Sequence, residues 1–145
     1  MNISYFNKNT KELLVVSSDC FLKTSKYSFV NPTICLIYFS EEFDKSEIVK
    51  MVNILIEIGV VFFITYGSFS EKMHDLIDEV IETSHLNLSH IVTASQSSQT
   101  IEDTAYFFLK ATYFGDDYCR YIIIFDRISE NINCFQKEAI NLFNA

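Results

Sequence analysis

The stretch from Ile58 to Glu71 most constrains the fold, because a helix end, a buried strand and a helix start follow one another within fourteen residues. Gly59 follows a periodic apolar run and can adopt the left-handed conformation that ends a helix. Residues 60–66 are apolar at both alternating sets of positions, which is typical of a strand that helices cover on both faces. The spacing of Ser68 and Glu71 is that of a capping box at the next helix start. A central strand of a parallel sheet is therefore predicted here.

The rest of the chain extends this alternation of strands and helices. Further strands are predicted at 13–17, 33–39, 88–94 and 120–125. Helices are predicted at 40–58, 70–84, 101–114 and 134–143, with a turn at 115–117. Ser40 or Asp44 is the expected N-cap of the first helix, and Thr100, with Asp103, that of the third.

Residues 18–32 show no helical period, so the first strand is expected at an edge of the sheet or antiparallel. The alternation predicts an α/β fold, a three-layer sandwich with a mostly parallel sheet, Rossmann-like or flavodoxin-like. Three Gly and one Pro leave no flexible linker, so residues 1–145 are expected to form a single α/β domain.

The charge of the chain is negative and uneven. The formal net charge is −8, and residues 41–145 hold seventeen acids against seven bases. Such a field repels nucleic acids and anionic membranes and attracts a basic protein, so nucleic-acid and membrane binding are not expected. The most apolar window, 48–66, contains two charged residues, and no signal peptide is recognisable at the start. A cytoplasmic location is therefore predicted.

Cysteine and histidine give no sign of a metal site. The four cysteines form no C-x-x-C pair and are expected to be small buried hydrophobes: Cys20, Cys35, Cys119 and Cys134. The three histidines, expected to be exposed or half-buried, form no helical metal-binding pair: His74, His85 and His90. No metal and no cofactor are predicted.

The carboxyl ends of the parallel strands are where such sheets bind ligands. After the strand at 88–94, four hydroxyls could hold an anion at a helix start: Ser95, Ser97, Ser98 and Thr100. Either Asp126, after the last strand, or Glu41 could act as a base or metal ligand, and Asp126 could form a cation site with Glu41, Glu42 and Asp44. Neither a three-glycine dinucleotide motif nor a Walker loop is present, and Arg127 stands where a receiver domain would place Lys. No catalytic residue is assigned.

The predicted helix at 70–84 carries acids at spacings of three and four, with Lys72 as the one base among them. The acids are Glu71, Asp75, Asp78, Glu79 and Glu82. Like charges at these spacings destabilise a helix, and Glu82 lies near the negative end of the helix dipole. This face is interpreted as a docking surface for a basic partner, with a solvated face as the alternative.

A further set of features follows a recognisable order between residues 31 and 125. The set comprises the strand Thr33–Phe39, Gly59 before an apolar strand ending in Tyr66-Gly67, Asp78, Ile91-Val92-Thr93, and Glu102 ahead of Tyr106-Phe107-Phe108. This order resembles a family of small bacterial α/β domains of unknown function. The chain departs from it at residues 95–99, where a Trp-His-acid run would be expected. The resemblance implies the fold and no activity.

Two functions from different classes are consistent with these patterns. The first is a small acidic protein-binding domain, an inhibitor or immunity protein that neutralises a basic bacterial toxin such as a nuclease. The alternative is a small-ligand or metal-dependent enzyme that uses the crevice at the carboxyl ends of the strands. A non-enzyme is favoured, because no catalytic motif is found. An exposed Phe or Tyr patch could serve a homodimer as well as a hetero-complex.

Overall fold

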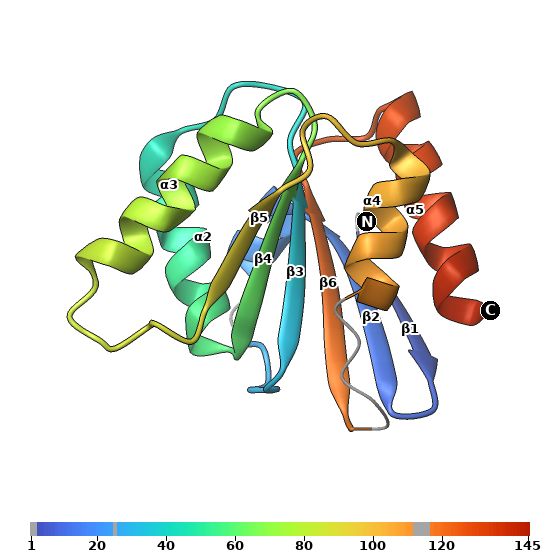
Figure 1. Cartoon of the computed structure of the whole chain (residues 1–145), viewed down its shortest axis with the longest axis horizontal. Helices are drawn as coiled ribbons and strands as arrows, with labels where there is room; N and C mark the ends of the chain where they lie inside the picture. Colours follow the sequence, from blue (N-terminus) through green and yellow to red (C-terminus); the bar gives the residue numbers. More distant parts are fainter. Residues whose placement is uncertain (1–2, 25, 112–116) are drawn as a thin grey trace.

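The computed structural model describes residues 3–24, 26–111 and 117–145, and contains a six-stranded sheet of order β1-β2-β6-β3-β4-β5 (Figure 1). The strands are β1 (Ile3–Lys8), β2 (Lys11–Ser17), β3 (Thr33–Tyr38), β4 (Val60–Tyr66), β5 (Val92–Ser95) and β6 (Cys119–Phe125). β1 and β2 pair antiparallel, and the other four neighbouring pairs are parallel. The expected α/β fold with a mostly parallel sheet is confirmed.

Helices cover both faces of the sheet. They are α1 (Ser18–Lys23), α2 (Lys45–Glu57), α3 (Ser70–Thr83), α4 (Ile101–Tyr106), its π-helical continuation η1 (Phe107–Ala111), and α5 (Glu130–Asn144). The core on one face is built with side chains of α1, α2 and α3, and the core on the other with α4, η1 and α5. Figure 1 shows α2 beside α3 and α4 beside α5. The three-layer sandwich follows from these two cores.

The apolar sequence of the central strands explains this layering. Every residue of β3 and β6 is buried, and successive side chains enter opposite cores. In β3, Cys35 and Ile37 join the core under α2, whereas Ile34 and Leu36 join the core under α5. Gly59 separates α2 from β4 with a φ of +109°, a conformation that glycine adopts at little steric cost.

The first strand of the chain differs from the predicted one. The segment 13–17 belongs to β2, which lies inside the sheet, antiparallel to β1 and parallel to β6. The strand at the antiparallel edge is β1, which the sequence analysis missed, together with α1 in the segment 18–32. Asn9, with a φ of +55°, supports the tight turn between β1 and β2, since asparagine tolerates this conformation better than most residues.

Two of the expected helix caps form and one does not. Asp44 caps α2 through Ser46 N, and Thr100 caps α4 through Asp103 N. The predicted capping box at Ser68 was wrong, because α3 begins at Ser70 without a side-chain cap. Its acid, Glu71, is instead hydrogen bonded beside β5, as described below.

Element boundaries also shifted. β5 begins at Val92 rather than at residue 88, and α5 begins at Glu130, capped by Ser129, rather than at 134. The predicted helix 101–114 becomes π-helical from Phe107. The last three residues of this prediction, 112–114, and the first two of the predicted turn, 115 and 116, lie outside the described residues.

The cysteines are only partly buried. Cys35 and Cys119 are buried as expected, and Cys20 is half-buried. Cys134 is exposed on α5, so its prediction as a core residue was wrong.

The described part of the chain contains no helix of the length and apolar character needed to cross a membrane.

A buried polar network lies at the amino ends of the strands. Arg120 is only 3% exposed, and its guanidinium donates to Thr33 Oγ1 at 3.2 Å and to the carbonyls of Ser28 and Ile58 at 2.8 Å each. These bonds join β6 to β3, to the segment before β3 and to the end of α2. Burial lowers the pKa of Arg120.

Its neighbour in the sheet, Glu12, is also buried and faces Arg120 across the β2–β6 register. The hydroxyls of Tyr5 and Tyr118 both donate to Glu12 Oε2. Only the protonated phenol of Tyr118 can donate this hydrogen bond, so the bond to Glu12 stabilises the protonated form and raises the pKa of Tyr118 to about 12.

Candidate functional site

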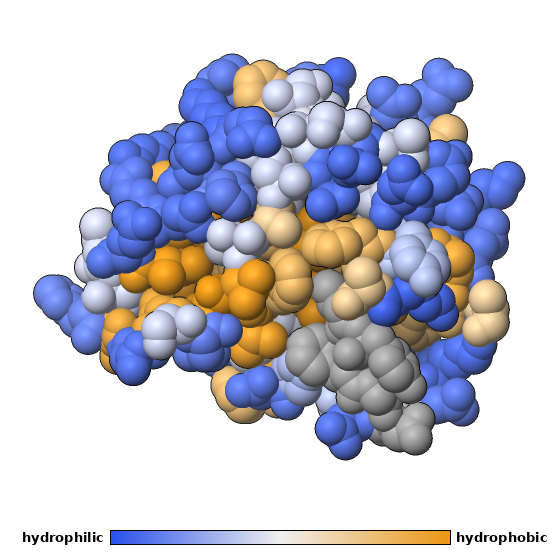
Figure 2. All heavy atoms as spheres, in the orientation of Figure 1, coloured by the Kyte–Doolittle hydropathy of each residue, from blue (hydrophilic) through white to orange (hydrophobic). Residues whose placement is uncertain are grey.

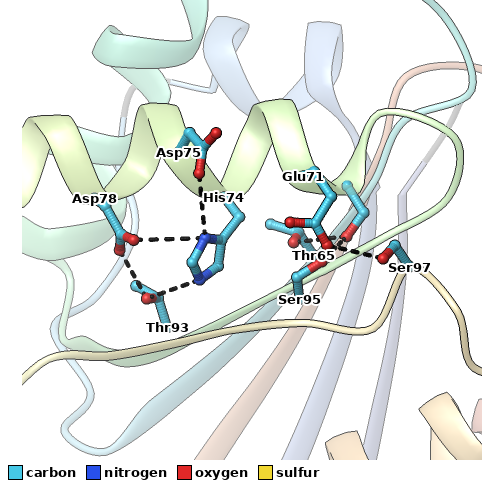
Figure 3. Close-up of polar contacts among 9 residues, drawn as sticks. Thr65, Glu71, His74, Asp75, Asp78, Thr93, Ser95 and Ser97 are labelled. Carbon is cyan, nitrogen blue, oxygen red and sulfur yellow. Dashed lines mark hydrogen bonds and ion pairs between the residues drawn. The ribbon is translucent and has the colours of Figure 1, made fainter.

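Polar side chains of α3 and β5 form two neighbouring clusters at one edge of the sheet (Figure 3). α3 packs against β4 and β5, and the alternation along β5 turns Thr93 and Ser95 toward α3. We call the following seven residues the polar strip: Glu71, His74, Asp75, Asp78, Thr93, Ser95 and Ser97.

One half of the polar strip is centred on Glu71. Ser95 and Ser97 donate to Glu71 Oε1 at 2.7 and 2.8 Å. Since the Ser95 proton is committed to Glu71, Ser95 accepts from Ser70 at 2.7 Å, and Ser70 in turn accepts from the buried Thr65 at 2.8 Å. A row of hydroxyls therefore runs from the core to the carboxylate.

This arrangement weakens Glu71 as a base. The hydrogen bonds from Ser95, and secondly from Ser97, lower the pKa of Glu71, because they stabilise its charged form. A carboxylate with a lowered pKa takes up a proton less readily at neutral pH, so a general-base role is disfavoured. Within the described residues no hydrogen bond reaches Glu71 Oε2, which leaves that oxygen as an acceptor for an incoming group.

The other half of the polar strip is centred on His74. Its Nε2 lies 3.2 Å from Thr93 Oγ1, and its Nδ1 lies 3.4 Å from Asp78 Oδ2 and 3.8 Å from Asp75 Oδ1. The Thr93 hydroxyl donates to Asp78 Oδ1 at 2.7 Å. A nucleophile activated by histidine would donate its proton to the ring. Here the hydroxyl proton goes to Asp78 Oδ1, so His74 does not act as the proton acceptor for Thr93 in this arrangement.

The structure divides the five acids predicted on the outer face of α3. Glu71 and Asp78 are hydrogen bonded beside β5, and Glu79 pairs with Lys45 of α2 at 3.3 Å. Asp75 has 83% of its side chain exposed, and Glu82 is exposed as well. Four of the five therefore recur along one side of α3, and Glu79 belongs to the side that faces α2.

The predicted ligand crevice does not form one site. Asp126 follows β6 and accepts from the backbone amides of Ser40, Glu41 and Arg127 at 2.9–3.0 Å. Ser95 follows at the end of β5, on the far side of β3 and β4 in the sheet order. Asp126 thus fastens the turn after β3, and two strands separate it from the serines with which it was predicted to act.

The other crevice residues have local partners or are exposed. Ser97 bonds Glu71, Thr100 caps α4, and Ser98 is exposed. Of the acids suggested beside Asp126, Glu41 pairs with Arg127. Asp44 caps α2 and Glu42 pairs with Lys72 at 2.7 Å. No group of three or more His, Cys, Asp or Glu residues among the described residues is placed to hold a metal ion.

Two residues of the polar strip were missed as site residues by sequence reasoning, His74 and Thr93. Their sequence signal was present but indirect. His74 lies three residues after Glu71 and four before Asp78, which places it on the same side of the helix. Thr93 alternates with Ser95, which places both on one face of the strand. Only the packing of α3 on β5 brings the two patterns together.

Comparison with known proteins places the chain in a family. The model of the domain of unknown function DUF7684 matches residues 15–136. The chain belongs to the DUF7684 family. The expected membership of an uncharacterised family is thereby confirmed. No curated protein matches this DUF7684 domain in sequence.

Among solved structures, the domain is similar to a UDP-N-acetylmuramoylalanyl-D-glutamyl-2,6-diaminopimelate–D-alanyl-D-alanyl ligase from Acinetobacter baumannii. The TM-score is 0.51 and the sequence identity 8%, over 95% of the DUF7684 domain. The DUF7684 domain spans only 28% of the length of that ligase. At this identity the likeness concerns the fold alone, and it agrees with an α/β sandwich.

Proposed function

We propose that this DUF7684 domain binds a basic protein partner through the side of α3 that faces β5. The observation that carries the proposal is the row of four acids at spacings of three and four residues, which we call the acidic row: Glu71, Asp75, Asp78 and Glu82. Lys72, the lysine of α3, pairs with Glu42, and Lys45 of α2 pairs with Glu79. The acidic row is thus left as concentrated negative charge.

Holding the row together costs helix stability. Like charges at these spacings destabilise a helix by about 0.2–0.5 kcal/mol per pair. Fixed contacts hold two of the acids in place, because Glu71 is bound by serines and Asp78 by Thr93. A fixed row of carboxylates suits electrostatic recognition, since charges that are already positioned need little ordering when a cationic partner arrives.

In its specific form, the proposal is that the domain is an inhibitor or immunity protein that neutralises a basic bacterial toxin, such as a nuclease, in the cytoplasm. The net charge of −8 on 145 residues supports this form, because nucleases that bind nucleic acid carry basic surfaces. Opposite fields accelerate the encounter of such a pair, and added salt slows it.

The proposal is tested by photocrosslinking in the native host, with a photoreactive residue at position 82 and, as a matched control, at position 138 on α5. A protein of basic isoelectric point should crosslink at 82 and not at 138. The absence of such a product, or equal products at both positions, would contradict the proposal.

The captured partner is then purified and its association rate measured. The double variant Asp75→Lys, Glu82→Lys should associate at least about ten-fold more slowly at low salt. Asp78 is spared, because its reversal would break the contacts with Thr93 and His74. The control, Asp117→Lys with Glu138→Lys, changes the net charge equally at exposed or half-buried acids away from α3. Equal rates for both variants would show that the acidic row is solvated surface.

A further inference from the structure

β5 is an edge strand whose outer side is unpaired within the described part of the chain. Gln96 N donates to Thr65 O at 2.8 Å, so the even-numbered residues of β5 turn their backbone groups toward β4. Alternation then turns the N–H and C=O groups of Thr93 and Ser95 toward the open edge. Such a row of free donors and acceptors is a template for another strand.

The two faces beside this edge differ in chemistry. On one face, Val92 is 50% exposed, Tyr106 of α4 is 59% exposed, and Ala94 and Phe62 are half-buried. Figure 2 shows apolar surface where β5 lies in Figure 1. On the other face, Thr93 and Ser95 lie beside the acids of α3 (Figure 3). An added strand would therefore meet an apolar surface on one side and carboxylates on the other.

We infer that the partner inserts an extended basic segment that pairs with the open edge of β5 as a seventh strand. This inference rests on the proposed function and names the binding mode. Side chains of a strand alternate between its faces, so the segment alternates apolar with basic residues. Its apolar residues pack beside Val92 and Ala94, and its Lys or Arg side chains reach Asp75, Asp78 and Glu71 Oε2.

A second copy of this chain fits the edge poorly. Two β5 strands paired about a twofold axis would place both α3 helices on the same side of the joined sheet, next to each other. The two acidic rows would then face each other across the junction, which like charges oppose. A basic segment neutralises the same charges, so the acidic row favours a different chain over a copy.

The inference is tested with synthetic peptides of eight residues. The probe alternates lysine with valine. One control has the same composition in two blocks, Lys4Val4, and the other is the alternating peptide with an N-methyl group on every backbone nitrogen, because methylation along one edge would leave the other edge free to pair. Binding is measured by fluorescence anisotropy, and amide hydrogen exchange by NMR. The alternating peptide should slow exchange of the Thr93 and Ser95 amides at least ten-fold, and the two controls should bind at least about ten-fold more weakly.

A pair of variants tests the same edge from the side of the protein. Thr93→Pro removes the outward N–H, whereas Thr93→Val keeps it. Both lose the hydroxyl that contacts His74 and Asp78. The proline variant should bind the alternating peptide at least about ten-fold more weakly than the valine variant, with thermal unfolding measured for both. If the proline variant does not fold, the N-methylated peptide gives the same information with the natural chain.

The outcomes separate the inference from the proposed function. Equal binding of all three peptides without protection of Thr93 and Ser95 overturns strand addition and leaves recognition of basic partners standing. No binding of any peptide at millimolar concentration also overturns strand addition. The proposed function fails separately, if no basic protein crosslinks at position 82.

Discussion

Replacing Arg120 with methionine should cost a large part of the stability of the domain. The guanidinium makes three hydrogen bonds in a site that is 3% exposed. Charged hydrogen bonds contribute about 1.5–3 kcal/mol each, but the cost of burying the charge offsets part of their sum. The lowered pKa of Arg120 has this same cause.

The size of the stability loss in Arg120→Met depends on whether the groups that Arg120 contacts keep other partners. The Ile58 carbonyl still accepts from Val30 N, and the Thr33 hydroxyl still donates to the Val30 carbonyl. The Ser28 carbonyl loses the bond from Arg120, and buried Glu12 loses its neighbouring positive charge. A loss of about 3–5 kcal/mol is expected, which is typical of a broken buried charged network. For a domain of this size that lowers Tm by about 10–16 °C.

Urea unfolding followed by circular dichroism measures this loss. Arg127→Met is the matched control, because the only other arginine of the chain is exposed and pairs with Glu41 at the surface. The control should change the free energy of unfolding by less than about 1 kcal/mol. The loss in the free energy of unfolding for Arg120→Lys should lie between those of the two methionine variants, since lysine keeps the charge and lacks the planar guanidinium that makes several hydrogen bonds. A loss under 1 kcal/mol for Arg120→Met would refute the reasoning that these bonds stabilise the fold.

Three further outcomes are expected. In the double variant Ser95→Ala, Ser97→Ala, the pKa of Glu71 should rise toward its ordinary value, as measured by carbon NMR. Because folding lowers this pKa, the ionised Glu71 stabilises the fold above its ordinary pKa, and this stabilisation disappears as the pH falls through the lowered pKa. In Glu12→Gln, the pKa of Tyr118 should fall from about 12 toward 10.0, as measured by ultraviolet absorbance. In the natural chain the protonated Tyr118 stabilises the fold below pH 10.0, and this stabilisation is lost as the pH rises through about 12. Gly59→Ala should cost about 2–4 kcal/mol in urea unfolding, because its Cβ would lie 2.0 Å from the Val30 carbonyl oxygen at a positive φ, and a loss under 1 kcal/mol would contradict that geometry.

The central strands could be predicted because strands that are buried on both faces consist mainly of apolar residues, which the sequence shows directly. β3, β4 and β6 lie between helices, so nearly all their side chains are apolar. The edge strands carry weaker patterns. β1 mixes half-buried and exposed residues, and β5 has four residues with none fully buried. Their identity depends on the neighbouring strand, which a local pattern does not contain.

The candidate site could be predicted only in part for a similar reason. Helical spacing places Glu71, Asp75 and Asp78 on one side of α3. It does not show that Thr93 and Ser95 reach them, because that depends on the parallel pairing of β5 with β4. Arg120 reads in the sequence as a lone charge at the start of an apolar strand, and its partners are mostly backbone carbonyls, which no residue type encodes.

The buried network around Arg120 and the acidic row lie on different parts of the fold, and this separation bears on how the family can diverge. Substitutions at Asp75, Glu82 or Ser98 alter exposed side chains that take no part in the bonds of Arg120. Such positions can change without loss of folding, so a lineage can alter the acidic row in small steps while the scaffold is inherited unchanged. In a library of randomised variants, folded members should tolerate nearly any residue at these three positions and few at 120.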